Sequence, residues 1–374
     1  MKEGWKYKKI GELFQTYAGG TPLKQHKEYY QGGDIPWLRS GEVCQKYITR
    51  TEMFITQKGL ENSSARYFPK DTVVIAMYGA TAAQVGILKI KTTSNQAVCG
   101  ILPNDNYSPE FIYYWFTYNK GNLASQAQGG AQPNISQIKI KNVLIPLLPL
   151  SEQQRIVSYL DSAFAKIDVV AKNAEDSLNE AKALFQSALA KMMEPKEGWE
   201  EKHLDELAEN LDYKRIPVTL NKRKSGKYPY YGASGIVDYV EDYIFDGNYL
   251  LISEDGANLL ARATPIAFPV TGKFWVNNHA HILEFKDSIT QLFVEFYFKL
   301  IDIKEYVTGA AQPKLTQRNM NKIPIFIPSL DKQKIVVCAL QNIESKVQQL
   351  QSNLTRTLSE CAALKQSILR QTFE

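Results

Sequence analysis

The sequence predicts an α+β protein with two similar mixed α/β globular domains, separated by two long antiparallel helices that form a coiled coil with pseudo-two-fold symmetry. Two observations carry this prediction. One stretch of sequence occurs twice in the same order, and each copy is followed by a long segment with helical hydrophobic spacing. The length of 374 residues suffices for two or three domains, and an internal repeat indicates how such domains follow one another.

The duplicated stretch is recognised by short landmarks at fixed offsets. Ala-Gln-Pro-Asn-Ile at 131–135 returns as Ala-Gln-Pro-Lys-Leu at 311–315, an offset of 180. Lys-Glu-Gly-Trp at 2–5 returns at 196–199, an offset of 194. The first globular domain is therefore 14 residues longer than the second, which indicates one scaffold with two different variable parts. The expected segments are 1–150 and 194–330 for the globular domains, and 151–193 and 331–374 for the long helices.

Within the globular domains, β-branched runs that end at glycine predict buried strands, and Ser108-Pro109-Glu110 predicts a helix start. The elements expected in the first domain are strands at 72–78, 85–90 and 97–102 and an aromatic helix at 111–118. The second domain repeats this order, because 249–258 matches 72–81, 278–280 matches 95–97 and 292–298 matches the aromatic helix, at offsets of 177, 183 and 182.

The two long segments show apolar positions that alternate steps of three and four residues, which is the pattern of a coiled-coil seam. The first seam runs from Val157 to Met192, and the second runs from Val336 to Ile368 through Leu350 and Leu364. At 1.5 Å per residue each helix is roughly 60 Å long. An isolated helix with such a stripe has nowhere to bury it, so we expect the two helices to pair with each other.

Composition and charge bound the class of protein. The chain contains no apolar run of the roughly 18–20 residues that cross a membrane, and its four cysteines form no Cys-x-x-Cys pair; a cytoplasmic, reduced protein is expected. Residues 1–150 hold 17 Lys and Arg against 10 Asp and Glu, whereas residues 194–330 hold 16 against 19. The basic first domain fits a polyanionic partner. Six of the basic residues of the acidic second domain lie within 214–227, so a local basic patch is possible there.

Motifs for common catalytic chemistry are absent from the sequence, which lacks a P-loop, a Gly-x-Gly-x-x-Gly fingerprint and a His-Glu-x-x-His zinc motif. His279 and His281 form the only close histidine pair. They are interpreted as a polar or ligand-proximal pair, with a metal site as the alternative. Glu254 and Asp255 are adjacent, so on a strand they diverge. A carboxylate in a DNA groove accepts a hydrogen bond from cytosine N4, which gives these acids a non-catalytic alternative.

The sequence resembles the specificity subunits of type I restriction–modification enzymes. The resemblance covers essentially the whole chain. It rests on the duplicated Ala-Gln-Pro-x-[Ile/Leu] landmark, the Pro-containing turn, and Ser-Glu-Gln-Gln-Arg-Ile-Val at 151–157 before a heptad helix. The second helix start, Leu-Asp-Lys-Gln-Lys-Ile-Val at 330–336, departs from the family pattern because it lacks the glutamate. Each motif is weak alone, but their duplication in order makes the match strong.

The resemblance implies that each globular domain is a target recognition domain for half of a bipartite site in double-stranded DNA, and that the helices set the spacing. The chain itself would be a non-catalytic subunit without a cofactor or metal. Two methylation subunits would bring S-adenosylmethionine, and restriction subunits would bring ATP and magnesium chemistry. No membrane partner is expected.

Residue types that contact phosphates or base edges, placed on turns and strand ends, give the candidate DNA-binding residues. In the first domain they are Lys24, Lys27, Arg39, Ser40, Tyr78, Thr81, Gln84, Asn95 and Gln96. In the second domain they are Lys222, Arg223, Lys224, Lys227, Tyr230, Tyr231, Ser234, Glu254, Asp255, Asn258, Arg262 and Asn278.

A plainer interpretation stands beside these candidates. Surface lysines are commonly only solvated, and Tyr230 and Tyr231 are also candidates for the core. Asn95 of the first domain is matched by Asn278 of the second, so a structural or phosphate-binding role fits these residues better than base recognition. The same holds for Gln132 and its match Gln312. The alternative function is an interaction scaffold whose helices assemble partners and whose globular domains bind protein or glycan. An enzyme with an unrecognised site is a third possibility that the motif census disfavours.

Overall fold

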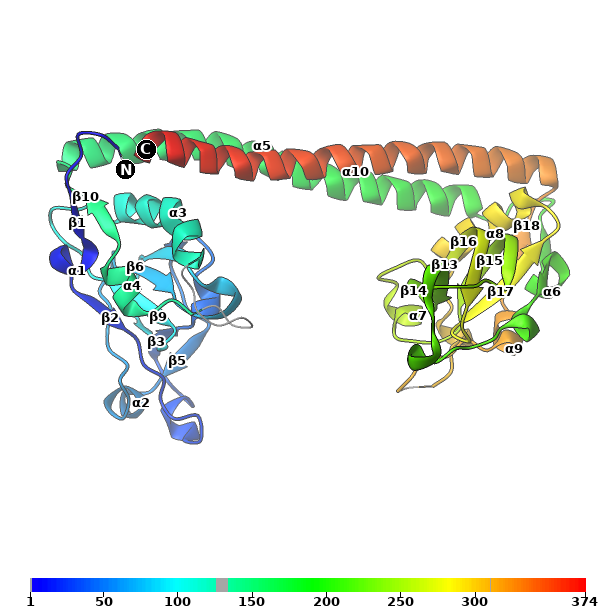
Figure 1. Ribbon diagram of the computed structural model, residues 1–374, viewed down its shortest axis with the longest axis horizontal. Coiled ribbons are helices and arrows are strands. Elements are labelled where there is room, and N and C mark those ends of the chain that lie inside the picture. Colours follow the sequence, from blue (N-terminus) through cyan, green and yellow to red (C-terminus); the bar gives the residue numbers. More distant parts are fainter. Residues whose placement is uncertain (1, 126–133, 310) are drawn as a thin grey trace. The chain divides into compact units, whose positions relative to one another are not determined.

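The computed structural model describes residues 2–125, 134–309 and 311–374 (Figure 1). The chain forms two compact units. Unit 1 comprises Met1–Ala174 with Arg356–Glu374, and unit 2 comprises Glu175–Thr355. Each unit therefore contains one globular part and pieces of both long helices, a division that differs from the four consecutive segments expected along the chain.

Unit 1 is built on a five-stranded sheet of order β2-β9-β6-β7-β4. These strands are β2 (Thr16–Ala18), β4 (Tyr47–Ile48), β6 (Val73–Ala76), β7 (Val85–Leu88) and β9 (Val98–Ile101). A three-stranded sheet of order β5-β3-β8 and a two-stranded sheet complete the unit; their strands are β1 (Tyr7–Lys9), β3 (Ile35–Leu38), β5 (Met53–Ile55), β8 (Thr93–Ser94) and β10 (Leu144–Pro146). The strands predicted at 72–78, 85–90 and 97–102 are confirmed as β6, β7 and β9.

Besides its strands, the globular part of unit 1 contains short helices and one helix of 17 residues that packs on the five-stranded sheet. They are α1 (Ile10–Leu13), α2 (Gln57–Glu61), α3 (Pro109–Ser125), α4 (Gln137–Lys141) and the short 3₁₀ turns η1 (Lys27–Tyr29), η2 (Ser40–Glu42) and η3 (Gly79–Thr81). The predicted aromatic helix is α3, which lies between the sheet and the long helices (Figure 1). Its Phe111 and Trp115 are buried in the same core as Ile75 of β6, so α3 joins the sheet to the helix pair.

Unit 2 is built on a six-stranded sheet of order β12-β17-β15-β16-β13-β14. Its strands, with the β11–β18 pair, are β11 (Glu200–Lys202), β12 (Ala208–Asn210), β13 (Ser225–Gly232), β14 (Gly235–Val240), β15 (Phe245–Ser253), β16 (Ala267–Val276), β17 (Ala280–Phe285) and β18 (Ile325–Ile327). Its helices are α6 (Leu204–Leu207), α7 (Asn258–Ala261), α8 (Ser288–Leu300), α9 (Gln317–Met320), η4 (Asp212–Lys214), η5 (Leu220–Lys222) and η6 (Lys304–Tyr306). The aromatic helix α8 covers the sheet as α3 does in unit 1.

The long helices are α5 (Leu150–Met193) and α10 (Leu330–Phe373), each of 44 residues. They run antiparallel within each unit. In unit 1 the beginning of α5, at Leu160, shares a core with the end of α10, at Leu369 and Phe373. In unit 2 the end of α5, at Leu189 and Met193, shares a core with the beginning of α10. None of the described helices is long and apolar enough to cross a membrane.

The seam of α10 differs from the predicted one at two positions. Leu350 and Leu364 are 42% and 51% exposed, whereas the neighbouring Gln351 and Lys365 are half-buried. Lys365 pairs with Asp168 of α5 and lies over the Phe164 ring at 5.3 Å. The aliphatic stem of a lysine can cover apolar surface while its ammonium reaches a carboxylate. At these two positions the hydrophobic pattern alone therefore places the seam one residue too early.

Replacement of Phe373 by alanine tests whether the end of α10 completes the core of unit 1. Phe373 is fully buried and lies 5.1 Å from Trp115, between ring centroids. We expect its truncation to cost about 3 kcal/mol and to lower hydrogen-exchange protection in α3 and β9, while β15 of unit 2 keeps its protection. Leu364→Ala, on the same helix but half-exposed, is the matched control. Equal loss of protection in both units would contradict this prediction.

Candidate nucleic-acid interface

Three segments of unit 1 converge at one edge of its sheets. Leu38 of β3 pairs with Ser94 of β8, and Ala76 of β6 pairs with Val98 of β9. The segments that follow β3 (39–42), follow β6 (78–81) and connect β8 to β9 (95–97) therefore lie together. We call these three segments the loop edge of unit 1.

The predicted residues Arg39, Ser40, Tyr78, Thr81, Asn95 and Gln96 all lie on this loop edge, and Gln84 immediately precedes the returning strand β7. Arg39, Ser40 and Asn95 line one open groove of about 810 Å³ together with Arg50. Arg50 is exposed and was missed by sequence reasoning, because only the folded chain brings it into one groove with Arg39. The structure thus gathers most of the first-domain candidates.

The side chains on this edge have different surroundings. The Arg39 guanidinium is paired with Glu42 at 3.5 Å and with Glu52. Tyr78 is 38% exposed. Asn95 Oδ1 is buried and has no hydrogen-bond partner among the described residues. A buried acceptor without a partner is costly, so this position is where a water molecule or a ligand donor is needed.

Lys24 and Lys27 lie on the long segment that leaves the loop edge after Gly19 and Gly20, and both are exposed. The segment is fastened by Thr21, which donates a hydrogen bond to Gln96. A Cβ on Gly20 would lie 2.1 Å from the Ala65 nitrogen, so only glycine allows this close crossing. Neither lysine is brought into contact with the other candidates by the hydrogen bonds and ion pairs of the described residues.

Unit 2 has the same convergence. Tyr231 of β13 pairs with Val276 of β16, and Ser253 of β15 pairs with Ala280 of β17. The turn from β13 into β14 (232–235), the segment that follows β15 (254–256) and the connection from β16 to β17 (277–279) therefore meet at one edge. We call them the loop edge of unit 2. Of the predicted residues, Ser234, Glu254, Asp255 and Asn278 lie on it.

The strand register corrects one repeat assignment. The pairs Ala76–Val98 and Ser253–Ala280 are equivalent, and they place residue 95 opposite residue 277, at an offset of 182 instead of 183. The recurring asparagine is therefore Asn277, not Asn278. Asn95 donates its backbone N–H to Leu38 at 2.9 Å, and Asn277 donates its own to Tyr231 at 3.0 Å. The wrong match arose because Asn277 and Asn278 are adjacent and only one of them repeats.

The last two residues of the duplicated landmark, 134–135 and 314–315, bond to the loop edge of their unit. Ile135 donates to the Met77 carbonyl at 2.8 Å, and Leu315 donates to the Glu254 carbonyl at 2.7 Å. Tyr78 bridges to Asn134 in unit 1, and Asp255 bridges to Lys314 in unit 2. The residues 131–133, including the candidate Gln132, lie outside the described residues, whereas Gln312 is exposed. The residues that end the landmark therefore make equivalent backbone contacts in both units.

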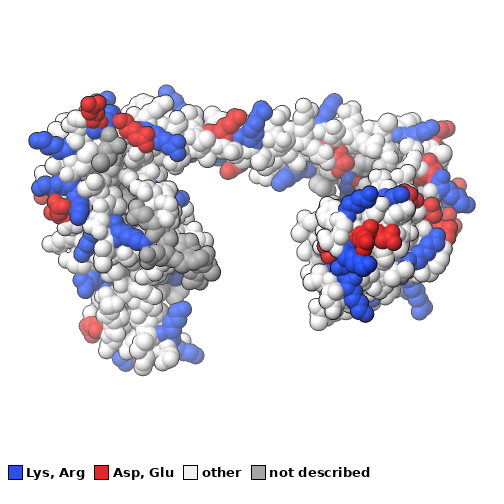
Figure 2. Space-filling view, viewed as in Figure 1, with Lys and Arg blue, Asp and Glu red and all other residues white. Residues whose placement is uncertain are grey.

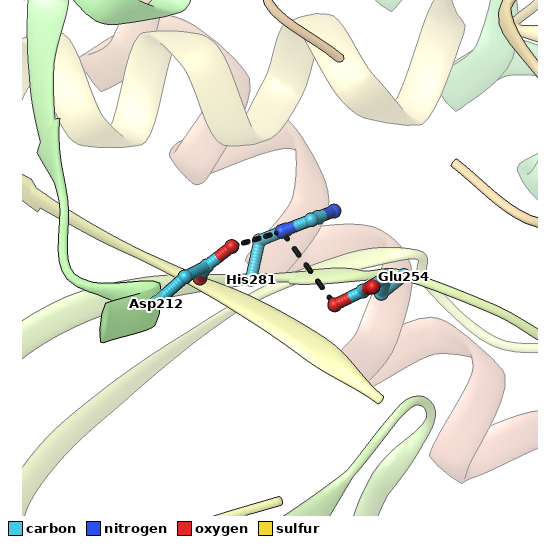
Figure 3. Close-up of side chains that lie close together, drawn as sticks. All are labelled: Asp212, Glu254 and His281. Atoms are coloured by element: carbon cyan, nitrogen blue, oxygen red, sulfur yellow. Dashed lines mark hydrogen bonds and ion pairs between the residues drawn. The ribbon is translucent and has the colours of Figure 1, made fainter. Parts of the chain in front are cut away.

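A buried ion network lies directly beneath the loop edge of unit 2 (Figure 3). His281 Nδ1 lies 2.5 Å from Asp212 and 3.8 Å from Glu254, and the three side chains come from η4, β17 and the end of β15. Arg215 pairs with Asp212 at 3.2 Å and with Glu254 at 2.6 Å. Lys314 pairs with Glu254 at 3.1 Å.

Asp212, Glu254 and His281 are close enough to one another to hold a metal ion. However, the guanidinium of Arg215 already contacts both carboxylates, and His281 Nε2 donates to the Leu315 carbonyl at 2.8 Å. A cation at the carboxylates would be repelled by Arg215. The geometry therefore favours a hydrogen-bonded ion network over the metal alternative, and it links four separate segments under the loop edge.

The charges of this network lower the pKa values of its carboxyl groups. Burial raises the pKa of Asp212, but the hydrogen bond from His281 and the charges of His281 and Arg215 outweigh it, so the pKa lies below the ordinary 3.8. Burial likewise opposes ionisation of Glu254, and Arg215, His281 and Lys314 together bring its pKa below the ordinary 4.5. Both carboxyl groups are therefore ionised in the folded protein near neutral pH.

The first unit has apolar residues at the equivalent places. The same offsets place Ala18, Met77 and Cys99 of unit 1 where unit 2 has Asp212, Glu254 and His281, since Ala18 pairs with Cys99 on neighbouring strands. Cys99 is fully buried, and burial raises the pKa of its thiol to about 12. The two loop edges thus share a backbone scaffold, but the side chains beneath them are apolar in unit 1 and charged in unit 2.

Several predicted residues of unit 2 have structural roles. Tyr230 is fully buried, and its hydroxyl accepts from the Val218 N–H at 3.0 Å. Arg262 donates to the carbonyls of Phe298 and Ile301 at the end of α8. The remaining candidates divide between Tyr231 and Asn258, which are half-buried, and Lys222, Lys224, Lys227, Ser234 and Asn278, which are exposed. Tyr231 packs on Phe274, and Asn258 bonds to Thr264.

The basic run at 214–227 is partly neutralised in the structure. The antiparallel pairing of β13 with β14 brings Asp238 and Glu241 next to it. Arg223 bonds to Asp238 at 3.2 Å and lies over the Tyr230 ring at 4.3 Å, and Lys224 pairs with Glu241 at 3.4 Å. Figure 2 shows basic and acidic side chains adjacent on the visible face of unit 2. Asp238 and Glu241, which follow the basic run in the sequence, therefore lie beside it in the folded unit.

The family model for the type I restriction modification DNA specificity domain matches residues 2–179 and again residues 196–359. Both globular parts and most of both long helices fall within these matches. The chain therefore belongs to the family of type I restriction–modification specificity subunits, and the resemblance stated from the sequence is confirmed.

Named relatives agree with this membership. A putative type I restriction enzyme specificity subunit of Haemophilus influenzae, S.HindORF215P, is 40% identical over 149 residues, which span 40% of this chain and 38% of that protein. The matched segment thus spans less than two thirds of the length of this relative. The MjaIX specificity subunit of Methanocaldococcus jannaschii is 26% identical over 405 residues, which span 98% of this chain and 91% of that protein.

The fold also matches a solved structure. The chain is similar to one from work on complex assembly and conformational transition of the type I R-M system, with a TM-score of 0.78 at 17% identity. The match covers 100% of this chain and 98% of that chain. The predicted fold class, two mixed α/β parts with long antiparallel helices, is confirmed.

Removal of the Arg215 guanidinium tests the ion network. Arg215→Ala leaves Asp212 and Glu254 buried without their main cation, and loss of one partner from a buried pair costs about 3 kcal/mol or more. We expect hydrogen-exchange protection to fall in β15 and β17 but not in β6 and β9. Lys224→Ala removes an exposed ion pair and should change protection little. If Arg215→Ala left β15 and β17 unchanged, the network would not support the edge.

Acidification tests the same network through its carboxyl groups. A carboxyl group whose folded pKa is lowered stabilises the folded state above its unfolded pKa, and this stabilisation is lost as the pH falls through the folded pKa. Urea unfolding should therefore show stability falling between about pH 5 and pH 3. The Asp212→Asn/Glu254→Gln double variant should lose less over this interval, since it lacks both ionisations. Parallel pH profiles for the two proteins would contradict the assignment.

Proposed function

We propose that this chain is the DNA-binding specificity subunit of a type I restriction–modification complex, in which each unit recognises one half of a bipartite double-stranded DNA site through its loop edge. The supporting observation is the pair of equivalent loop edges. Their backbone registers agree, whereas the side chains at equivalent positions differ, as with Tyr78 and Asp255 or Gln96 and Asn278. One scaffold with two sets of polar side chains fits recognition of two different sequences.

Polar side chains on loops fit both kinds of DNA contact. Arg39, Arg50 and the exposed lysines carry the charge that phosphates require, and Gln96, Asn278 and Asp255 carry groups that match base edges. In this proposal α5 and α10 set the gap between the two half-sites and provide the surface on which two methylation subunits dock. Half-sites on one face of a duplex are spaced by about 34–36 Å per turn, and a helix of 44 residues is about 66 Å long.

In the proposed complex the chain contributes recognition, and its partners contribute catalysis. The methylation subunits would bind S-adenosylmethionine, the restriction subunits would use ATP and magnesium, and the complex would act in the cytoplasm. The five charged groups beneath the loop edge of unit 2 are consistent with this division, because they are paired with one another.

An interaction scaffold that binds protein or glycan is the alternative. The family match covers both globular parts with a DNA specificity domain, so this alternative is not favoured. A salt titration separates the two functions, because contacts to phosphates release counterions and make the logarithm of affinity fall linearly with the logarithm of salt concentration. The assembled complex is the appropriate sample, since the methylation subunits would add DNA-contacting surface.

Genomic methylation mapping with and without the chain tests the proposed function. The proposal predicts a bipartite modified motif in the host that disappears when the chain is deleted and returns when it is supplied again. A set of modified motifs that is unaffected by the deletion, in a host whose methylation subunits are intact, would contradict it.

Insertion of one heptad into α5 and one into α10, at matched positions of the pair, tests the role of the helices. The gap between the half-sites should change, while both half-sites keep their sequences, because the loop edges are untouched. Methylation mapping of the inserted protein reads out both quantities. Altered half-site sequences would show that the helices do more than set spacing.

A further inference from the structure

The loop edge of unit 2 carries one imidazole whose orientation is fixed. His279 lies in the segment 277–279, where its N–H donates to Asn277 Oδ1 at 2.8 Å and its carbonyl accepts from the Glu254 N–H at 2.9 Å. Asn277 is in turn held by Tyr231 at 3.0 Å. The backbone at His279 is therefore tied to two of the three segments that form the edge.

The side chain of His279 is held as firmly as its backbone. Its Nδ1 lies 2.7 Å and 3.0 Å from the two carboxylate oxygens of Asp255. The Asp255 side chain is only 14% exposed, whereas that of His279 is 46% exposed. The backbone of Asp255 also forms an antiparallel β-bridge with Lys314 of the duplicated landmark. A largely covered carboxylate thus fixes a half-exposed ring.

This geometry determines what the ring offers to solvent. A carboxylate accepts and does not donate, so the proton of the uncharged imidazole lies on Nδ1, and Nε2 is an acceptor. Within the described part of the chain, Nε2 has no hydrogen-bond partner. Donors that match such an acceptor in the major groove are the amino groups of adenine N6 and cytosine N4.

Unit 1 offers nothing comparable at the equivalent positions. The offset of 182 places Ala97 opposite His279, and the offset of 177 places Tyr78 opposite Asp255. Ala97 is buried, at 7% exposure. The His279–Asp255 pair therefore occurs in only one of two units that share a backbone scaffold. A residue that distinguishes one half-site from the other is expected to occur in only one unit.

We propose that His279 is a specificity-determining residue of unit 2, whose Nε2 accepts a hydrogen bond from an adenine or cytosine amino group in one half-site, and that Asp255 is the positioning residue for its ring. This inference rests on the proposed function and deepens it. It assigns a direct base contact to one residue that the list of sequence candidates omitted.

Two substitutions separate the contact from its support. In His279→Asn the amide nitrogen stands where Nδ1 stood, so the bond to Asp255 is kept and the acceptor at Nε2 is lost. In His279→Gln the side-chain amide reaches the place of Nε2 and supplies an acceptor there. His26→Asn is the matched control, because His26 also pairs with a carboxylate, that of Glu28 at 3.1 Å, but lies outside the loop edge.

The experiment is methylation mapping in a host that carries each variant as its only copy of the full chain, beside unchanged methylation subunits. We expect His279→Asn to lose roughly 5- to 150-fold of discrimination at a single adenine or cytosine position of one half-site, which corresponds to about 1–3 kcal/mol. The other half-site should keep its sequence. His279→Gln should retain most of the discrimination, and His26→Asn should match the original motif.

The outcomes distinguish this inference from the proposed function. Absence of any bipartite motif with the original chain would overturn the proposed function itself. With that motif present, an unchanged motif for His279→Asn, or a change in both half-sites, would overturn the role of His279. If His279→Asn abolished methylation, His279→Gln would decide, because restored discrimination supports the contact and continued loss contradicts it.

Discussion

Neither globular part of this protein completes its own hydrophobic core. The core of unit 1 includes Leu369 and Phe373, from the far end of the sequence, and the core of unit 2 includes Leu189 and Met193, from the end of the first long helix. Burial of these side chains requires the helices to pair antiparallel in each unit. Each copy of the repeat thus supplies the start of its long helix to its own unit and the end of that helix to the core of the other unit.

The loop edges depend on that core through the sheets. Strands β6 and β9 in unit 1, and β15 and β17 in unit 2, pack on an aromatic helix, and the segments that extend beyond them meet because their registers are fixed. The side chains beneath the two loop edges differ. Unit 1 places Met77 and Cys99 under its edge, whereas unit 2 places Glu254 and His281 there, with Arg215 and Lys314 as counter-charges. A rigid scaffold can therefore present different polar groups without a change of fold.

Much of this organisation could be predicted from the sequence, because periodicity and repetition are local signals. The long helices, the buried strands β6, β7 and β9, and the aromatic helices α3 and α8 all follow from such patterns. Strands β13, β14 and β16 were missed, since their Tyr-, Gly- and Pro-rich sequences lack clear alternation. The seam at Lys365, the register of Asn277 and the His279–Asp255 pair depend on contacts between distant segments. Only the assembled sheet brings those segments together.

In the proposed complex, both loop edges face DNA. Hydrogen exchange of that complex, measured with and without DNA that carries its methylated motif, shows whether both edges contact DNA. We expect DNA to add protection at 39–42, 78–81 and 95–97 in unit 1 and at 232–235, 254–256 and 277–279 in unit 2. Added protection confined to other surfaces, or to a single unit, would contradict it.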